Sequence, residues 1–392
     1  MGGLSSLAQH PSTFTGALLS ANLTAMSVTW RQALAWRMRQ QLLEPIGNEP
    51  VEGVVRRLGA VQAQLDSAAE IAIRTRRQRS RSGDVAGALA DGRIIKTFAF
   101  RGATHLMTPE EGGNYLALRA ASRMWELPSW QSFYNLVPSD WPHFREAVRE
   151  ALTAGPLTRD ELGAAITARP KFRHLVFVFE GHSRTLLKPL AWQGDMSFGP
   201  VRDGQATFQR LDQNPRWTGI PGLDEAGERA VEAYFRAYGP ATHEHLHYWL
   251  GGGLGAGRKR IQAWIASLDN RLAPVDVDGE PAYILRDDLE ELAATHAGAV
   301  VRLLPGYDQW VLGPGTADPH VVPPRRRTLL SRQASFVIIG GVVGATWSLT
   351  DDGVGIGWFG EGGSPPREAL AAEVARLARI LDRPLQMSVQ KV

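Results

Sequence analysis

Two glutamines, Gln62 and Gln64, could together hold a water molecule for attack on a bound molecule. Each side-chain amide offers one acceptor oxygen and two donor hydrogens, but it cannot take up a proton as a carboxylate does. Residues two apart lie on one side of an extended segment and about 200° apart on a helix, so joint action requires an extended backbone here. Such a pair suits a reaction that needs a positioned nucleophile and no strong base. Taken alone, a Gln-x-Gln pair usually belongs to an ordinary polar loop.

A second segment, 243–247, reads His-Glu-His-Leu-His and matches the His-Glu-x-x-His pattern of zinc proteases. In those enzymes both histidines lie well inside a helix, and a third ligand comes from another element. Here Pro240 ends the preceding helix and Thr242 is placed to cap the next, so His243 falls in the first turn. We therefore expect no metal site and no cofactor, and zinc metalloprotease is the weakest alternative function.

The elements around the glutamines predict a helical unit that ends in a short hairpin. Apolar residues four apart mark one helix face near the start of the chain, and Gly59 ends a second helix just before the glutamines. A turn at Arg101-Gly102 would join two strands. Helices followed by a short hairpin are the order of a winged helix. The predicted helices span 29–43, 50–58 and 85–91, and the predicted strands span 94–100 and 104–107.

An internal repeat predicts that this unit recurs. The segments 155–162 and 239–246 share Gly-Pro-x-Thr-x-x-x-Leu at identical spacing, and each follows an amphipathic helix. In both copies Pro breaks one helix and Thr is placed to cap the next. The second copy continues into a helix over 258–268 and an alternating segment, 272–285, with a turn at Asp278-Gly279. Beyond it the pattern changes to strands at 301–304, 336–339, 342–349 and 354–359 and a final helix through 370–381.

We therefore predict an α+β fold of tandem winged-helix units with a C-terminal β-rich module. A length of 392 residues leaves room for several compact units. The expected regions are a flexible leader (1–25), a first winged-helix region with the Gln-x-Gln motif (26–140), a second (141–225), a third (226–300), and a β-rich module with a terminal amphipathic helix (301–392).

The composition excludes several classes of protein. Hydrophobic residues make up 44% and charged residues 21%, as in ordinary globular proteins. No apolar run approaches the roughly 20 residues that cross a bilayer, and the leader lacks the basic region of a secretory signal. We expect no membrane association. With no cysteine there is no disulfide framework, which fits the reducing cytoplasm, where we expect the protein to act.

The basic residues are strongly biased toward arginine. Of the 43 basic residues five are Lys, so 38 are Arg, and the sequence pI is about 9.3. Arginine binds phosphate with two parallel hydrogen bonds and stacks on bases, which favours a nucleic-acid partner. A GC-rich genome would produce the same bias, because Ala and Gly are abundant too.

Four segments together resemble the AlkZ-type winged-helix DNA glycosylases. They are Leu-Gly-Ala-Val-Gln-Ala-Gln at 58–64, the hairpin 97–106, Leu-Pro-Gly-Tyr-Asp at 304–308, and the run Arg325-Arg326-Arg327. The likeness extends from about Met26 to Phe359. It implies three winged helices and a β-rich module arranged as a C-shaped basic channel around duplex DNA. It also implies excision of N7-alkylated purines and unhooking of interstrand crosslinks.

The resemblance assigns the chemistry to Gln62 and Gln64. A sister branch carries Gln-x-Asp, so Gln64 favours crosslink-specific action, as in self-resistance to azinomycin-type agents. Alkylation at N7 leaves the purine positively charged, so it departs as a neutral base without a general acid. What is left is to position water and to stabilise an oxocarbenium-like sugar. No Lys lies near this segment in sequence except Lys96, which favours a monofunctional, hydrolytic enzyme over a lyase.

Further residues are candidates for support and for DNA contacts. Asp66 and Asp308 could assist the water or the sugar cation, although such carboxylates more often cap a helix or pair with arginine. A second basic run, 74–81, could follow the DNA backbone or simply be exposed. Aromatic residues beside a turn are also more often core. The expected DNA contacts are Arg101, Thr104, His105, Tyr307, Trp310, Arg325, Arg326 and Arg327.

A winged-helix transcription regulator without catalysis is the main alternative, because fold alone does not decide function. Regulators commonly carry one winged helix per chain and dimerise, whereas this chain carries tandem units. We therefore expect a monomer that acts on double-stranded DNA with alkylated or crosslinked purines.

Overall fold

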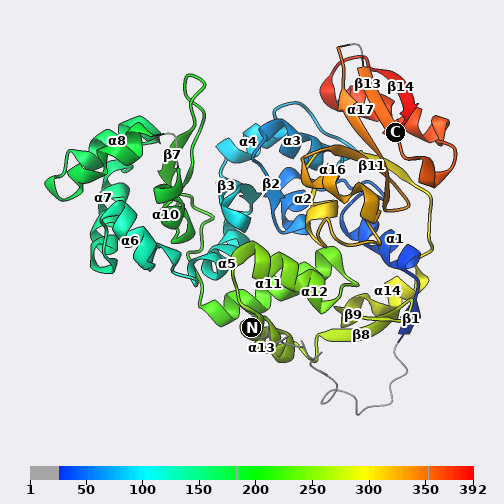
Figure 1. The fold of residues 1–392 in the computed structure, drawn as a ribbon, viewed down its shortest axis with the longest axis horizontal. Helices are drawn as coiled ribbons and strands as arrows, with labels where there is room; N and C mark the ends of the chain where they lie inside the picture. Colours follow the sequence, from blue (N-terminus) through cyan, green and yellow to red (C-terminus); the bar gives the residue numbers. More distant parts are fainter. Residues whose placement is uncertain (1–25, 182–183, 352) are drawn as a thin grey trace, which may run out of the picture.

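The computed structural model describes residues 26–181, 184–351 and 353–392, so the expected leader (1–25) lies outside the described residues. The fold is α+β, with helices and three separate sheets. Within the described residues no helix is long and apolar enough to span a membrane. In Figure 1 the segment from α6 to β7 forms one lobe, and the C-terminal sheet with α17 forms another. The strands and helices around Gln62 lie between them.

The predicted elements of the first region are confirmed. Thr29 caps the first helix by accepting from Gln32 N (3.2 Å), and Gly59 ends the second with φ 74°. Helices and a hairpin then follow in the expected order. The elements are β1 (Met26–Val28), α1 (Trp30–Gln40), α2 (Val51–Leu58), β2 (Val61–Gln62), α3 (Asp66–Arg74), α4 (Asp84–Ala90), β3 (Ile95–Phe98), η1 (Phe100–Gly102), β4 (Thr104–Met107) and α5 (Pro109–Ala120).

One six-stranded sheet joins the first region to the second, in the order β2-β4-β3-β6-β7-β5. The junction is a single antiparallel pair, Lys96 with Phe198. Thr158 caps α8 as expected, accepting from Glu161 N at 3.3 Å. The elements are η2 (Met124–Glu126), α6 (Pro128–Tyr134), η3 (Pro138–Asp140), α7 (Trp141–Ala151), β5 (Leu157–Thr158), α8 (Arg159–Thr167), η4 (Pro170–Leu175), α9 (Val176–Glu180), η5 (Thr185–Leu187), α10 (Lys188–Trp192), β6 (Met196–Phe198) and β7 (Thr207–Arg210).

The third region repeats the capped helix and the hairpin. Thr242 accepts from His245 N (3.2 Å), and the hairpin turns at Asp278 and Gly279, both at positive φ. Strand β1 adds to this hairpin in parallel, and Trp30 N donates to Asp278 Oδ2 (2.8 Å), so the start of the described chain is fixed here. The elements are α11 (Leu223–Tyr238), α12 (His243–Leu246), η6 (His247–Gly252), α13 (Arg258–Ser267), β8 (Leu272–Val277), β9 (Glu280–Leu285), η7 (Arg286–Asp288) and α14 (Leu289–Ala294).

The C-terminal module is a five-stranded sheet in chain order, covered by one long helix. The helix packs apolar residues, Leu370, Val374, Leu377 and Ile380, against the sheet in one buried cluster. The last strand, β14, was not predicted, and it pairs in parallel with β13. The elements are β10 (Val301–Leu304), α15 (Gln309–Leu312), η8 (Pro324–Arg326), α16 (Arg327–Ser331), β11 (Ser335–Ile339), β12 (Val342–Leu349), β13 (Gly353–Trp358), η9 (Gly360–Gly362), α17 (Arg367–Leu381) and β14 (Gln386–Lys391).

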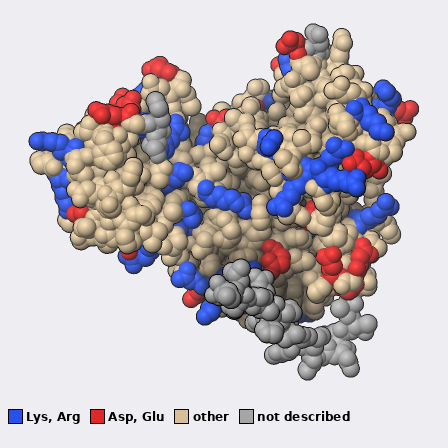
Figure 2. Space-filling view, in the orientation of Figure 1, with Lys and Arg blue, Asp and Glu red and all other residues tan. Residues whose placement is uncertain are grey.

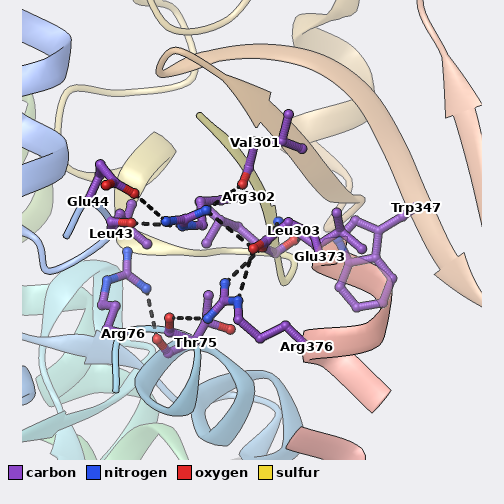
Figure 3. A network of polar contacts seen from close by, with 12 residues as sticks. Leu43, Glu44, Thr75, Arg76, Val301, Arg302, Leu303, Trp347, Glu373 and Arg376 are labelled. Carbon is purple, nitrogen blue, oxygen red and sulfur yellow. Dashed lines mark hydrogen bonds and ion pairs between the residues drawn. The ribbon is translucent and has the colours of Figure 1, made fainter. Parts of the chain in front are cut away.

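Buried charges join this module to the first region (Figure 3). The guanidinium of Arg302 donates to Leu43 O (2.7 Å) and pairs with Glu373 (3.2 Å). Arg376 pairs with the same Glu373 (2.8 Å) and donates to Thr75 O, at the end of α3 (2.7 Å). Because a buried charge without its partner is costly, these contacts fix how the module sits on the first region.

Candidate active site

The two glutamines lie on the short strand β2 and the residues that follow it. Gln62 pairs with His105 on β4, and Ala63 N donates to Thr104 O at 2.8 Å. Thr104 Oγ1 donates back to Ala63 O (2.8 Å), so both backbone polar groups of Ala63 are bonded to Thr104. The extended strand ends at Gln62, and Gln64 follows in a bend, so neither glutamine lies in a regular helix.

The two amides touch each other and differ in exposure. Gln62 Nε2 donates to Gln64 Oε1 at 3.3 Å. The Gln62 side chain is buried (9% exposed), whereas Gln64 is exposed. The buried amide therefore orients the exposed one, which leaves polar atoms of Gln64 free to meet a water or a ligand.

Alternation along β2 separates the core from the chemistry. Val61 and Ala63 are buried in the cluster formed with α2, α3 and α4. Gln62 and Gln64 therefore face away from that core. In the same cross-strand row as Gln62 stand His105 and then Thr97.

His105, the cross-strand partner of Gln62, is a buried and neutral ring. Its side chain is 3% exposed, it packs beside Phe100, and its Nδ1 donates to Ala103 O (3.1 Å). Burial, helped by the charge of Arg101, lowers the pKa of His105 to about 4. It therefore carries no charge at pH 7, so a direct ionic contact with phosphate is not available to it.

Asp66 and Lys96 pair with each other instead of meeting the glutamines. Asp66 begins α3, and Lys96 Nζ lies 2.5 Å from its carboxylate. The register sets Lys96 in the row of Val61 and Leu106, on the face of the sheet opposite to Gln62. In space Lys96 therefore meets Asp66 and not the glutamines, a position that does not suit Schiff-base chemistry beside Gln62 and Gln64.

Asp308 and Trp310 have structural partners. Asp308 is 2% exposed, binds Arg76 through both oxygens (2.7 Å each), and caps α15 by accepting from Trp310 N (2.8 Å). Trp310 is fully buried, and its indole donates to Gly341 O (2.8 Å). Asp308 thus has the more common role of such a carboxylate, capping and pairing with arginine. Tyr307, in contrast, is half-buried with φ 62° and borders the surface.

The comparisons with known proteins agree on one family. The model of the AlkZ-like DNA glycosylases matches residues 55–380. The interstrand DNA cross-link repair glycosylase of Streptomyces sahachiroi is 36% identical over 360 residues, which is 90% of this chain and 97% of that protein. The solved structure of the Streptomyces sahachiroi DNA glycosylase AlkZ superimposes with a TM-score of 0.86 at 35% identity, covering 94% of this chain and all of the other.

The chain belongs to the AlkZ-like DNA glycosylase family. Members of a DNA glycosylase family hydrolyse the N-glycosidic bond between base and sugar, so the chain is an enzyme. This finding favours catalysis over the alternative of a regulator that only binds DNA.

The expected arginine contacts are placed differently from one another. Arg325 in η8 and Arg327 at the start of α16 are both exposed. Arg326 is partly covered, with Glu361 at 3.0 Å and the Phe359 ring 4.3 Å from its guanidinium. Arg101 is exposed at the hairpin tip, over the ring of Tyr248 at 4.3 Å.

The second basic run divides between core and surface. Arg74 and Arg76 are buried and paired with carboxylates, so they are unavailable to DNA. Arg79 and Arg81 are exposed. Across the face in Figure 2, Lys and Arg side chains form a broken band between the two lobes, and most Asp and Glu lie above and below it.

The His-Glu-x-x-His segment has the context that we predicted for it. His243 is the first residue of α12, and its ring stacks on Tyr283 at 4.8 Å. His245 lies 3.6 Å from Asp318, and burial lowers its pKa to about 4. Among the described residues no group of three or more His, Cys, Asp or Glu side chains could hold a metal ion.

A glycine-rich segment and two cations near the hairpin were not predicted from the sequence. Residues 251–257 read Gly-Gly-Gly-Leu-Gly-Ala-Gly and are followed by Arg-Lys-Arg. This run of glycines before basic residues could have been recognised in the sequence as a candidate anion-binding segment. The cations, Arg119 and Lys188, stand in unremarkable sequence, and only the fold brings them near Arg101.

Proposed function

We propose that this glycosylase removes N7-alkylated purines from double-stranded DNA, including purines in interstrand crosslinks, through a water held by Gln62 and Gln64. The observation that carries the proposal is the pair of touching amides on the face of β2 that turns away from the core. The crosslink-repair glycosylase that is 36% identical supports the substrate class.

The chemistry follows from what the site lacks. The carboxylates nearest in sequence, Asp66 and Glu70, are both engaged by cations, so neither is free to act as a base. An N7-alkylated purine is already cationic and leaves as a neutral base, so protonation of the leaving group is unnecessary. The amide oxygens of Gln62 and Gln64 can orient water and face the developing positive charge on the sugar. A normal guanine would not leave from such a site.

We propose further that the first three regions (26–140, 141–225 and 226–300) are winged-helix units and that they form, with the module 301–392, a C-shaped channel for the duplex. The notch between the two lobes and the basic band support this arrangement (Figure 2). Because the first two regions share a sheet and all three share one buried cluster, they would bind DNA as one rigid monomer.

The experiment is incubation of the purified protein with a duplex that contains a single N7-methylguanine, followed by detection of abasic sites. We expect release of the methylated base, no release of unmodified guanine, and no effect of EDTA. Gln62→Ala and Gln64→Ala should each slow excision by about 100-fold. Full activity in both variants would refute the assignment of the site, and release of normal guanine would refute the substrate argument.

A further inference from the structure

Three cations around the hairpin that pairs with β2 have no acidic partner among the described residues. They are Arg101 at the hairpin tip, Arg119 at the end of α5 and Lys188 at the start of α10. Within the described residues no ion pair involves any of them. Most other basic side chains close to the core do have a carboxylate, as Arg76 and Arg302 illustrate.

Each of the three cations rests on an aromatic ring instead. The ring centroid lies 4.3 Å from the guanidinium of Arg101 (Tyr248), 4.3 Å from that of Arg119 (Trp192), and 5.6 Å from the amine of Lys188 (Phe98). A ring face fixes the position of a cation while leaving its charge uncompensated. The three positive charges are therefore fixed in position and can be neutralised by an anion that is not part of the chain.

The three cations form one cluster, linked through glycines. A side chain at Gly102 would begin 3.2 Å from Lys188 Nζ, and Gly102 directly follows Arg101. A side chain at Gly252 would begin 3.9 Å from Arg101 Nη2, and one at Gly255 would begin 3.6 Å from Arg119 Nη1. Lys188 and Arg119 in turn are close enough that their charges repel each other.

The electrostatic cost of this arrangement is visible in the lysine. Burial, and next the charge of Arg119, lower the pKa of Lys188. Burial also lowers the pKa of Arg119. An anion bound among the three side chains would remove both penalties. The glycines Gly252 and Gly255 are exposed, so a bulky anion can approach their backbone without meeting a side chain.

The cluster lies beside the candidate catalytic residues. Gln62 pairs with His105 and Ala63 N donates to Thr104 O, two residues from Gly102, while the charge of Arg101 acts on the ring of His105. An anion held at Gly102 would therefore be within reach of a nucleotide whose sugar meets the two amides. In duplex DNA the anion attached directly to a sugar is its phosphodiester.

We propose that Arg101, Arg119 and Lys188 bind one phosphodiester beside the damaged nucleotide and so position its sugar over Gln62 and Gln64. The proposal rests on the function proposed above. Lys188 and Arg119 are positioning residues: they act on the phosphate and do not touch the bond that breaks. Their contribution should appear at one phosphate only, whereas general attraction to DNA would be spread over many.

The test combines a protein variant with a chemically neutral phosphate. Duplexes carry one N7-methylguanine and one methylphosphonate linkage, moved through each position around the lesion. Single-turnover excision and equilibrium binding are measured for the wild type and for Lys188→Met, in which methionine keeps an apolar chain over Phe98. Lys188→Arg tests rescue by charge. Lys171→Met is the matched control, because Lys171 is half exposed and pairs with Asp140 at 3.0 Å.

We expect one linkage whose neutralisation lowers kcat/KM of the wild type by about tenfold or more. On DNA with an unmodified backbone, the kcat/KM of Lys188→Met should fall by a similar factor, and neutralising that one linkage should lower it no further. The kcat/KM values of Lys188→Arg and Lys171→Met should stay near that of the wild type. The proposal would be overturned if, at every linkage, the loss of kcat/KM caused by Lys188→Met multiplied with the loss caused by the neutral linkage. If the wild type releases no base, the proposed function fails, and the same pattern of coupling in the binding data still decides whether the cluster holds a phosphate.

Discussion

Replacing Asp308 with asparagine should weaken the fold and leave the chemistry nearly intact. The carboxylate is 2% exposed, and both of its oxygens accept from the guanidinium of Arg76, which is itself fully buried. Asparagine has the same shape and can still accept from Trp310 N. It cannot neutralise Arg76. Breaking a buried pair by removing one partner leaves an uncompensated charge and typically costs about 3–5 kcal/mol.

The measurement separates stability from catalysis. Urea unfolding followed by tryptophan fluorescence should yield a free energy of unfolding lower by that amount in Asp308→Asn. Single-turnover excision of N7-methylguanine, measured where both proteins are folded, should differ by less than about threefold. Asp66→Asn is the matched control, because Asp66 is 72% exposed and its pair with Lys96 is at the surface, so stability should hardly change.

Two outcomes would refute this reasoning. If Asp308→Asn unfolds at the same urea concentration as the wild type but excises about 100-fold more slowly, then Asp308 acts in the reaction. If Arg76→Met combined with Asp308→Leu is as unstable as Asp308→Asn, then the uncompensated charge is not the cause, because an apolar replacement of the whole pair should recover much of the loss.

The remaining predictions concern His105 and Trp310. The pKa of His105 is about 4 in the folded protein, below its ordinary value of 6.5. Between these two pH values the unfolded chain therefore binds more protons than the folded chain. The contribution of His105 to the free energy of unfolding is complete above pH 6.5 and is lost as the pH falls toward 4. His105→Gln should therefore lose less stability than the wild type in urea unfolding between pH 6.5 and 4, and an identical pH profile would contradict this. Trp310→Phe removes the hydrogen bond to Gly341 O and should lower the free energy of unfolding by about 1–2 kcal/mol. The affinity for DNA, measured by anisotropy titration, should not change. Weaker binding with unchanged stability would instead show that Trp310 contacts DNA.

Local signals in the sequence were enough to predict most elements around the site. The cap at Thr29, the positive φ at Gly59 and the turn at Asp278-Gly279 each depend on neighbours in the chain, so short patterns report them. Pairing between distant strands has no such local signal. Strand β1 has three residues, too few for a visible alternation, and it pairs with β8 far along the chain.

The same distinction explains which parts of the site were found. Gln62 and Gln64 were predicted from a contiguous segment, and the structure brings their side-chain amides into contact. Asp308 and Trp310 came from a segment just as distinctive, yet their partners Arg76 and Gly341 are distant in sequence and take both side chains into the interior. A motif thus predicts proximity along the chain, and only packing decides exposure.

The geometry of β2 explains how a site without a strong base can be exact. On a strand, a shift in pairing of one residue would turn Gln62 and Gln64 into the core and bring Val61 and Ala63 to the surface. Burial of the two apolar side chains opposes that shift, and both backbone polar groups of Ala63 are bonded to Thr104. In the proposed reaction, water positioned by amides depends on distance and angle more than on proton affinity, so we expect the packing of Val61 and Ala63 to affect its selectivity.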